Sequence, residues 1–318
     1  MRQEAFERAR AAEWERFERA LASIALRKVV ADFPRLYRVL CQDLVLARDR
    51  RFDAALVQRL NALALRGHQV LYGAGLAQGG FLDLFLRRFP RAVRREWRLA
   101  LLLSVFFYGS FAATFLGVRS KPDLVYSIVD EAQVASFEAM YDPASDHFDE
   151  PRGAAEGVGM FFFYVGNNVG VDFRTFAGGI LFGIGSLFII GINGVLIGAV
   201  AGHISNVGYG ETFYPFVIGH GSFELTAVVL SGVAGMRMGL ALLVTGPRSR
   251  GAMLRAATLR SVPILYGTIA ITVIAAVIEA LWSGQPVIPA QVRYAVGAGL
   301  WLLVIVWLAL GGRRWRRA

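Results

Sequence analysis

The chain has 318 residues, of which 55% are hydrophobic, 34 are lysine or arginine and 24 are aspartate or glutamate. Its single cysteine, Cys41, excludes an internal disulfide framework and any metal site built from cysteines. A formal charge of +10 would suggest a polyanionic partner in a soluble protein. Here the distribution of charge around apolar segments accounts for it, so we predict no nucleic-acid partner.

Residues 1–98 have the pattern of a helical bundle on the cytoplasmic side of a membrane. Apolar residues recur at helical spacing in three stretches, and Asp32 and Asp53 precede the second and third as candidate N-caps. The residues predicted to form the bundle core are Phe6, Trp14, Phe17, Leu21, Ile24, Leu36, Leu40, Leu44, Leu56, Leu60 and Leu63. The domain ends in the segment 81–98, dense in arginines and aromatics, which we expect to lie on the inner leaflet as an amphipathic helix.

Residues 99–118, 262–282 and 294–312 are the clearest membrane-spanning helices. A helix needs about 20 apolar residues to cross a bilayer, and these stretches carry no charge except Glu279. Glu279 lies four residues from the end of its stretch, so we expect its side chain to reach the membrane surface.

Residues 157–246 are predicted to cross the membrane three more times. The first crossing is the short stretch 157–173, which could also be half a crossing or an interfacial elbow. The second runs from Thr175 to His203 and the third from Tyr214 to Val244. Each of the latter two contains glycines, at 191–194 and 219–221, where the helix could break.

Basic residues gather on the cytoplasmic side of membrane proteins, and this bias sets the expected orientation. Residues 1–98 hold 20 basic and 11 acidic residues, whereas 119–156 hold 3 basic and 9 acidic ones. The loop 246–261 and the tail 313–318 are basic again. The sequence therefore predicts about six spans within 99–312, an acidic outer loop at 119–156, and both termini in the cytoplasm.

His220 and Glu224 lie inside the apolar run "VIGHGSFELTAVVLSG", where an ionisable group costs about 2.5 kcal/mol or more. Four residues apart, they share a helix face and can hydrogen-bond. They are the candidate catalytic residues, although nothing in the sequence fixes a reaction. Further candidates for a polar membrane core are Asn167, Asn168, Asn193 and His203.

Glycines spaced by about four residues favour helices whose backbones nearly touch. The positions predicted to pack in this way are Gly179, Gly183, Gly194, Gly198, Gly202, Gly235 and Gly239.

Several motifs together resemble the stage II sporulation protein M (SpoIIM) family of multi-pass membrane proteins. They are "FPRLYRVLCQDLVLAR", "FYVGNNV", "FAGGILFGIGSLF", "NGVLIGAVAGH" and "HGSFELTAVVLSGVAGMRMG". The resemblance implies an all-α polytopic protein of the cell envelope, in the cytoplasmic (inner) membrane. It also implies partners among envelope-complex membrane proteins and MoxR-type AAA ATPases, besides the lipid bilayer.

Three functions remain open. In the first, the chain is a scaffold or component of a cell-envelope remodelling complex and recruits partners through its bundle. In the second, it is a transporter or channel-like protein with Glu224 as the coupling acid. In the third, it is an intramembrane hydrolase in which His203, His220 and Glu224 bind a metal or Glu224 acts as general base. The sequence favours a role other than catalysis, predicts no cofactor and leaves a metal undecided.

Overall fold

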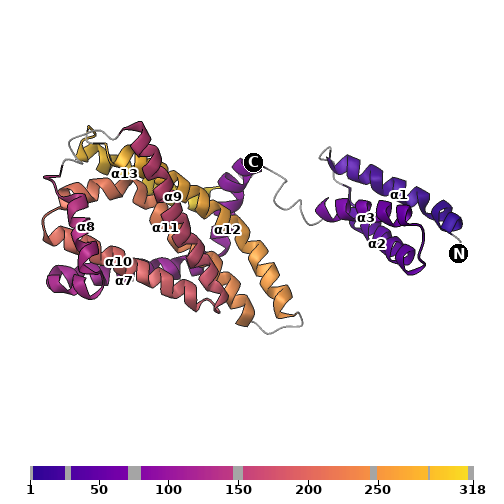
Figure 1. Ribbon diagram of the computed structural model, residues 1–318, viewed down its shortest axis with the longest axis horizontal. Helices are drawn as coiled ribbons and strands as arrows, with labels where there is room; N and C mark the ends of the chain where they lie inside the picture. Colours follow the sequence, from indigo (N-terminus) through magenta and orange to yellow (C-terminus); the bar gives the residue numbers. More distant parts are fainter. Residues whose placement is uncertain are drawn as a thin grey trace. The chain divides into compact units, whose positions relative to one another are not determined.

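The computed structural model describes six stretches of the chain: residues 3–25, 30–70, 80–145, 153–243, 249–285 and 287–313. These residues form helices joined by turns, with no strand among them, which confirms the predicted all-α class (Figure 1). The chain divides into an N-terminal unit, Met1–Gly80, and a membrane unit, Phe81–Ala318. The segment 81–98, which the sequence assigned to the N-terminal bundle, thus groups with the membrane unit.

Three helices build the N-terminal unit: α1 (Gln3–Ala25), α2 (Phe33–Asp49) and α3 (Ala54–His68). The predicted core residues are all buried except Ile24, which is partly buried and packs against the others. Asp32 and Asp53 precede α2 and α3 as expected, but neither side chain makes a capping hydrogen bond. Helical spacing of apolar residues was therefore sufficient to identify this core.

A buried carboxylate that the sequence did not single out joins α1 to α2. Asp43 is 1% exposed, accepts a 2.9 Å hydrogen bond from Trp14 Nε1, and forms a 3.1 Å ion pair with Arg10. Both carboxylate oxygens are thus paired, as burial of a charge requires.

Five helices of the described chain are long and apolar enough to cross a membrane. The first two of the three clearest predicted spans lie within α7 and the helix pair α12 and η6, and the third, 294–312, ends two residues beyond α13. The five are α7 (Trp97–Ser120), α10 (Ile184–Asn206), α11 (Gly210–Leu243), α12 (Arg250–Ile278), which continues as the π-helix η6 (Glu279–Ser283), and α13 (Ala290–Leu310).

The predicted short crossing 157–173 is part of a longer helix, α9 (Ala154–Ala177). At about 1.5 Å per residue its 24 residues reach far enough for a bilayer. It is not among the five helices just named, and it carries Glu156, Asp172 and Arg174. It packs against α10, α11 and α12, so it belongs to the membrane unit (Figure 1).

The helices change direction at residues 178–183 rather than at the glycines where the sequence suggested a break. The turn contains the 3-10 helix η5 (Gly178–Ile180) and two left-handed residues, Phe182 at φ 54° and Gly183 at φ 87°. It divides the predicted crossing from Thr175 to His203, so that Thr175 ends up in α9. The glycines at 191–194 and 219–221 lie inside continuous helices.

Glycines bring the backbones of the membrane unit together. Gly194, Gly198 and Gly202 on α10 lie so close to the α7 backbone that a Cβ at any of them would meet a carbonyl oxygen of α7. In the turn, a Cβ at Gly179 would meet the backbone of Gly235 of α11, and a Cβ at Gly239 of α11 would meet the backbone of Gly179 and Gly183. The first three glycines occupy a helix face, whereas Gly179 and Gly183 occupy a turn.

The acidic segment after α7 folds into the 3-10 helix η3 (Pro122–Ser127) and α8 (Glu131–Tyr141). Asp130 caps α8 by accepting a hydrogen bond from the Gln133 amide. Val134 and Tyr141 are buried against the rest of the unit. Residues 146–152, which complete the predicted acidic loop, lie outside the described residues, as do 314–318 of the basic tail.

The basic segment is a broken helix in three parts: α5 (Gly80–Asp83), the π-helix η2 (Leu84–Arg88) and α6 (Phe89–Arg95). Phe89 is fully buried, and its ring lies directly over Gly267 of α12. Arg94 donates hydrogen bonds to the carbonyls of Leu308 (2.8 Å) and Gly311 (2.6 Å), at the end of α13. These contacts fix α6 on the membrane helices.

Candidate functional site

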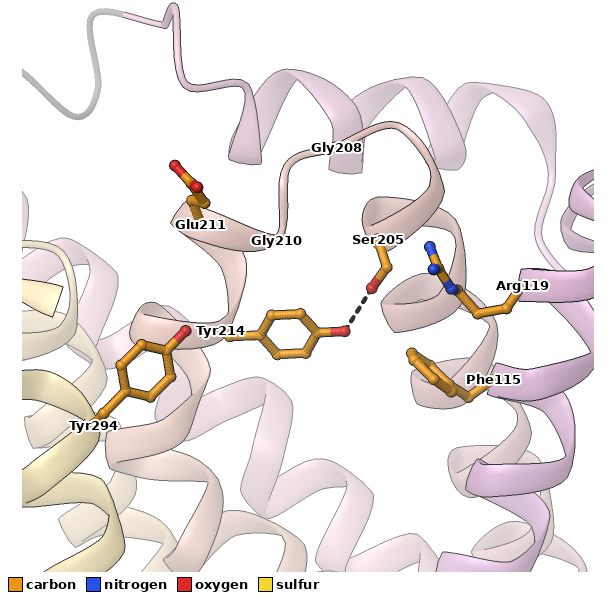
Figure 2. A pocket seen from close by; sticks show the side chains of 8 residues that line it. All are labelled: Phe115, Arg119, Ser205, Gly208, Gly210, Glu211, Tyr214 and Tyr294. Atoms are coloured by element: carbon orange, nitrogen blue, oxygen red, sulfur yellow. Dashed lines mark hydrogen bonds between the residues drawn. The ribbon is translucent and has the colours of Figure 1, made fainter. Parts of the chain in front are cut away.

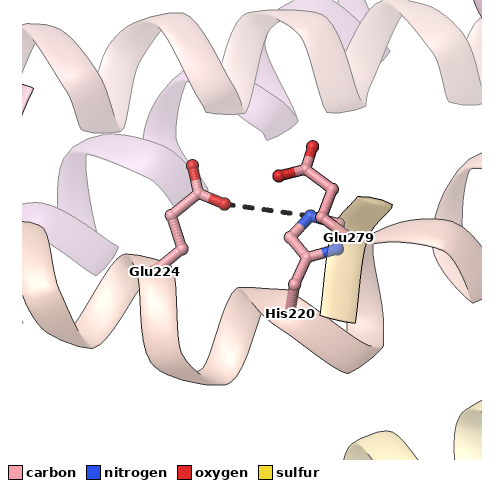
Figure 3. Close-up of side chains that lie close together, drawn as sticks. All are labelled: His220, Glu224 and Glu279. Carbon is pink, nitrogen blue, oxygen red and sulfur yellow. Dashed lines mark ion pairs between the residues drawn. The ribbon is translucent and has the colours of Figure 1, made fainter. Parts of the chain in front are cut away.

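Three ionisable side chains meet inside the membrane unit. His220 and Glu224 lie on α11, and Glu279 opens the π-helix η6 (Figure 3). One ligand atom from each lies within 4.8 Å of the other two. We refer to His220, Glu224 and Glu279 as the intramembrane cluster.

The imidazole of His220 is held from two sides. Its Nδ1 lies 3.1 Å from Ser283 Oγ, and its Nε2 lies 3.8 Å from Glu224 Oε2. The first distance is a hydrogen bond and the second is too long for one. His220 and Glu224 therefore share a helix face as expected, without the direct hydrogen bond that the sequence suggested.

The π-helix and a glycine explain how η6 reaches His220. Short π-helical segments inside α-helices are frequent at functional sites, and η6 presents both Glu279 and Ser283 to α11. Gly219 makes room for this approach, because a Cβ there would lie 2.6 Å from the ring of Trp282.

Glu279 is buried among the helices instead of pointing outward, contrary to the expectation from its position in the sequence. Only 8% of the residue is exposed, and its carboxylate faces His220 and Glu224. Glu224 is the most accessible member of the cluster, with 26% of its side-chain surface exposed against 5% for His220. Glu224 is therefore the member of the cluster that the helices enclose least.

A second polar layer on α9 lies close to this cluster. Asp172 is 1% exposed, and Thr272 of α12 donates a 2.5 Å hydrogen bond to its Oδ2. Asp172 is near enough to Glu224 for the two carboxylates to interact electrostatically. Asn168 lies one turn earlier on α9 and is also buried.

Carboxylates that share a buried site cannot all remain charged without a compensating cation. Glu224 has no lysine or arginine at ion-pair distance among the described residues. The arrangement therefore suits either protons on the carboxylates or a bound cation. It is not an arrangement that apolar packing alone would require.

The family described as Stage II sporulation protein M (SpoIIM) matches residues 99–284, more than half of the chain. The chain belongs to the SpoIIM family. A domain of unknown function (DUF8413) matches residues 4–73, which correspond to the N-terminal unit. No curated protein and no solved structure matches the chain.

The matched SpoIIM region extends from α7 to η6 and contains the whole intramembrane cluster and Asp172. Helix α13 lies outside it. Family membership and the apolar helices identify the chain as an integral membrane protein.

The other sequence candidates do not join the cluster. His203 Nε2 lies 2.6 Å from Glu138 Oε1 of α8, with Tyr126 against its ring. Asn193 donates to the carbonyl of Ile189 in its own helix, and Asn167 donates to the side chain of Asn168. The sequence predicted His203, His220 and Glu224 as possible metal ligands. In the structure Glu279, and not His203, lies beside His220 and Glu224.

A cavity of about 580 Å³ lies where α10 turns into α11 in the SpoIIM domain (Figure 2). Ser205 Oγ and Tyr214 OH are 2.5 Å apart across it, and Arg119, Glu211 and Tyr294 line its rim. No member of the intramembrane cluster lines this cavity. It is therefore a separate feature.

Proposed function

We propose that the SpoIIM domain of this chain is a channel-like unit that carries protons across the membrane, with Glu224 as the residue that takes up and releases the proton. The observation that carries this proposal is the meeting of Glu224, Glu279 and His220 inside a bundle of apolar helices. Ionisable groups at such depth are costly and mark proton relays and ion pathways.

Each member of the cluster has a role that follows from its position. Glu224 exchanges protons because it is the most accessible of the three. His220, fixed by Ser283, lies next to both carboxylates and passes the proton between them. Glu279 is the second acceptor, on the neighbouring helix.

The spacing of the cluster is wider than a bound zinc ion would set. Zinc bound at 2.0–2.2 Å in a tetrahedral site brings its ligand atoms to about 3.4 Å from one another. The candidate atoms here all lie within 4.8 Å of one another, and His220 Nε2 lies 3.8 Å from Glu224 Oε2. A metal would require all three side chains to move closer together, whereas a proton passes between His220 and Glu224 once their 3.8 Å gap closes to hydrogen-bond distance or holds one water molecule.

Replacement of Glu224 separates this role from a structural one. Glu224→Gln keeps the shape of the side chain and removes its titratable group, so the protein should stay as stable as the parent and lose its cellular function. Glu156→Gln makes the same change at an exposed position on α9 and should preserve both. Normal function of Glu224→Gln at normal protein level would contradict the proposal.

Metal analysis of the purified chain tests the alternative occupant. The proposal expects no stoichiometric zinc, manganese or iron in the parent. If the parent contains one metal ion per chain and His220→Ala loses it, the cluster binds a metal instead of a proton. That result would contradict the proposal and favour the hydrolase function.

A scaffold role is a second candidate, favoured by the N-terminal unit. This unit has its own core and its own family match, so it is built as a separate module. We propose that it recruits a cytoplasmic partner, such as a MoxR-type AAA ATPase, to an envelope complex in the cytoplasmic membrane. Deletion of residues 1–80 should leave the membrane unit inserted and abolish that association; retention of every partner would contradict recruitment.

A further inference from the structure

A second cavity in the membrane unit, of about 720 Å³, is lined by charges of mainly one sign. It lies between η2 and α6 on one side and α11 and α12 on the other. Among the described residues that line it, Glu96 is the only acid. The basic ones are Arg88, Arg91, Arg95, Arg237 and Arg260.

The arginines come from positions that the fold fixes. Arg88, Arg91 and Arg95 are spaced by three and four residues, which places them on one face of the segment η2 and α6. The hydrogen bonds of Arg94 to the end of α13 hold that segment in place. Burial, together with the charges of Arg313 and Arg91, lowers the pKa of Arg94, as expected where cations are crowded.

The residues that line the cavity carry more hydrogen-bond donors than there are acceptors among them. Glu96 is already engaged by Arg237 at 3.1 Å. Arg95 and Arg260 are exposed and have no acidic partner among the described residues. Ser261, 1% exposed, also lines the cavity, and its Oγ has no hydrogen-bond partner in the described part of the chain.

We propose that this arginine pocket binds the phosphate groups of an anionic lipid headgroup. Phosphate oxygens accept several charge-assisted hydrogen bonds at once, and arginine supplies donors in a matching planar fork. The volume lies in the range of sites for drug-sized ligands, which is larger than a single phosphate requires. A headgroup with two phosphates therefore fits best.

The position of the pocket, beside the first residues of the membrane-spanning helix α7, favours a lipid over a soluble phosphate compound. Glu96 immediately precedes Trp97, the first residue of α7, and Trp97 is itself exposed, as is usual for tryptophan at a membrane interface. Leu101, one turn further along α7, is exposed to the surroundings of the bundle. A headgroup in the pocket would thus have its acyl chains beside the apolar surface of α7. Basic pockets between membrane helices bind lipid headgroups in this way.

The test measures lipid binding to the full-length chain in detergent by native mass spectrometry. The probes are diphosphatidylglycerol, phosphatidylglycerol, phosphatidylcholine and inorganic pyrophosphate. Arg95→Gln/Arg260→Gln removes two pocket charges, and Arg250→Gln/Arg255→Gln removes two exposed charges from α12 outside the pocket. Arg95→Lys/Arg260→Lys retains the charge and serves as a check on folding.

The parent is expected to bind diphosphatidylglycerol more tightly than the other three probes. The pocket variant should bind it on the order of 30-fold more weakly, the sum expected for two arginines near a membrane surface. The α12 control should stay close to the parent and the lysine variant between the two. Equal loss in the pocket variant and the α12 control would overturn the proposal, and so would pyrophosphate binding as tightly as the lipid.

Discussion

Thr272 of α12 donates a 2.5 Å hydrogen bond to the buried carboxylate of Asp172 on α9. The two residues are 100 positions apart in the chain, so the bond joins two helices that are distant in sequence. It also satisfies part of the hydrogen-bonding demand of an acid that is 1% exposed. It is therefore a sensitive point for the stability of the membrane unit.

Thr272→Val keeps the shape of the side chain and removes the donor. It should lower the free energy of unfolding by about 1–3 kcal/mol, the cost of leaving a buried acceptor without its partner. Thr258→Val is the matched control on the same helix, because the Thr258 hydroxyl donates only to Leu254 O of its own helix. Thermal unfolding in detergent measures both; equal melting temperatures would show that the bond does not stabilise the fold.

Gly239→Ala should destabilise the membrane unit more than any exposed glycine substitution. A Cβ at Gly239 would collide with backbone atoms of Gly179 and Gly183, and backbone cannot move aside as a flexible side chain does. Gly251→Ala is the control, since nothing lies within 4 Å of a Cβ there. That control should be neutral or more stable by up to about 1 kcal/mol, because alanine favours helix. Similar melting temperatures for both variants would contradict the close packing.

Cysteine labelling tests the proposed orientation. In a chain with Cys41→Ser, Ala144→Cys and Val287→Cys should react with a membrane-impermeant reagent added outside intact cells. Ser249→Cys should react only after the cells are permeabilised. All three positions are exposed, so accessibility differs only by side of the membrane. Labelling at 249 in intact cells would contradict the six-span arrangement with cytoplasmic ends.

The N-terminal unit should fold without the membrane unit. A fragment of residues 1–80 is expected to be helical by circular dichroism and to unfold cooperatively. Leu60→Ala should lower its free energy of unfolding by about 2–5 kcal/mol, because Leu60 is fully buried. Val45→Ala, at a side chain 67% exposed, is the control and should have little effect. A fragment without cooperative unfolding would show that this unit depends on the rest of the chain.

Most of the N-terminal core was predictable because its large apolar residues recur at helical spacing, whereas the buried Asp43 gave no such signal. Two of the three residues of the intramembrane cluster were predictable from the sequence. His220 and Glu224 stood out as ionisable residues four apart in an apolar run. Glu279 was misplaced because its burial depends on the π-helical turn of η6, which no spacing in the sequence reveals.

Two further features of the membrane unit depend on tertiary packing and could not be predicted from the sequence. The sequence analysis did not single out Asp172, because its burial depends on how α9 packs on α12. The change of direction at 178–183 could not be told from other glycine-rich positions, because the same residue type serves both turns and close helix contacts. Tertiary packing decided between these two uses.

Proton movement through the purified chain tests the central claim most directly. The parent is reconstituted in liposomes that contain a pH-sensitive dye, and a potassium diffusion potential drives protons across the membrane. The account predicts that the parent carries protons faster than protein-free liposomes, that Glu156→Gln matches the parent, and that Glu224→Gln falls to the protein-free rate. Proton flux of Glu224→Gln equal to that of the parent would contradict the account.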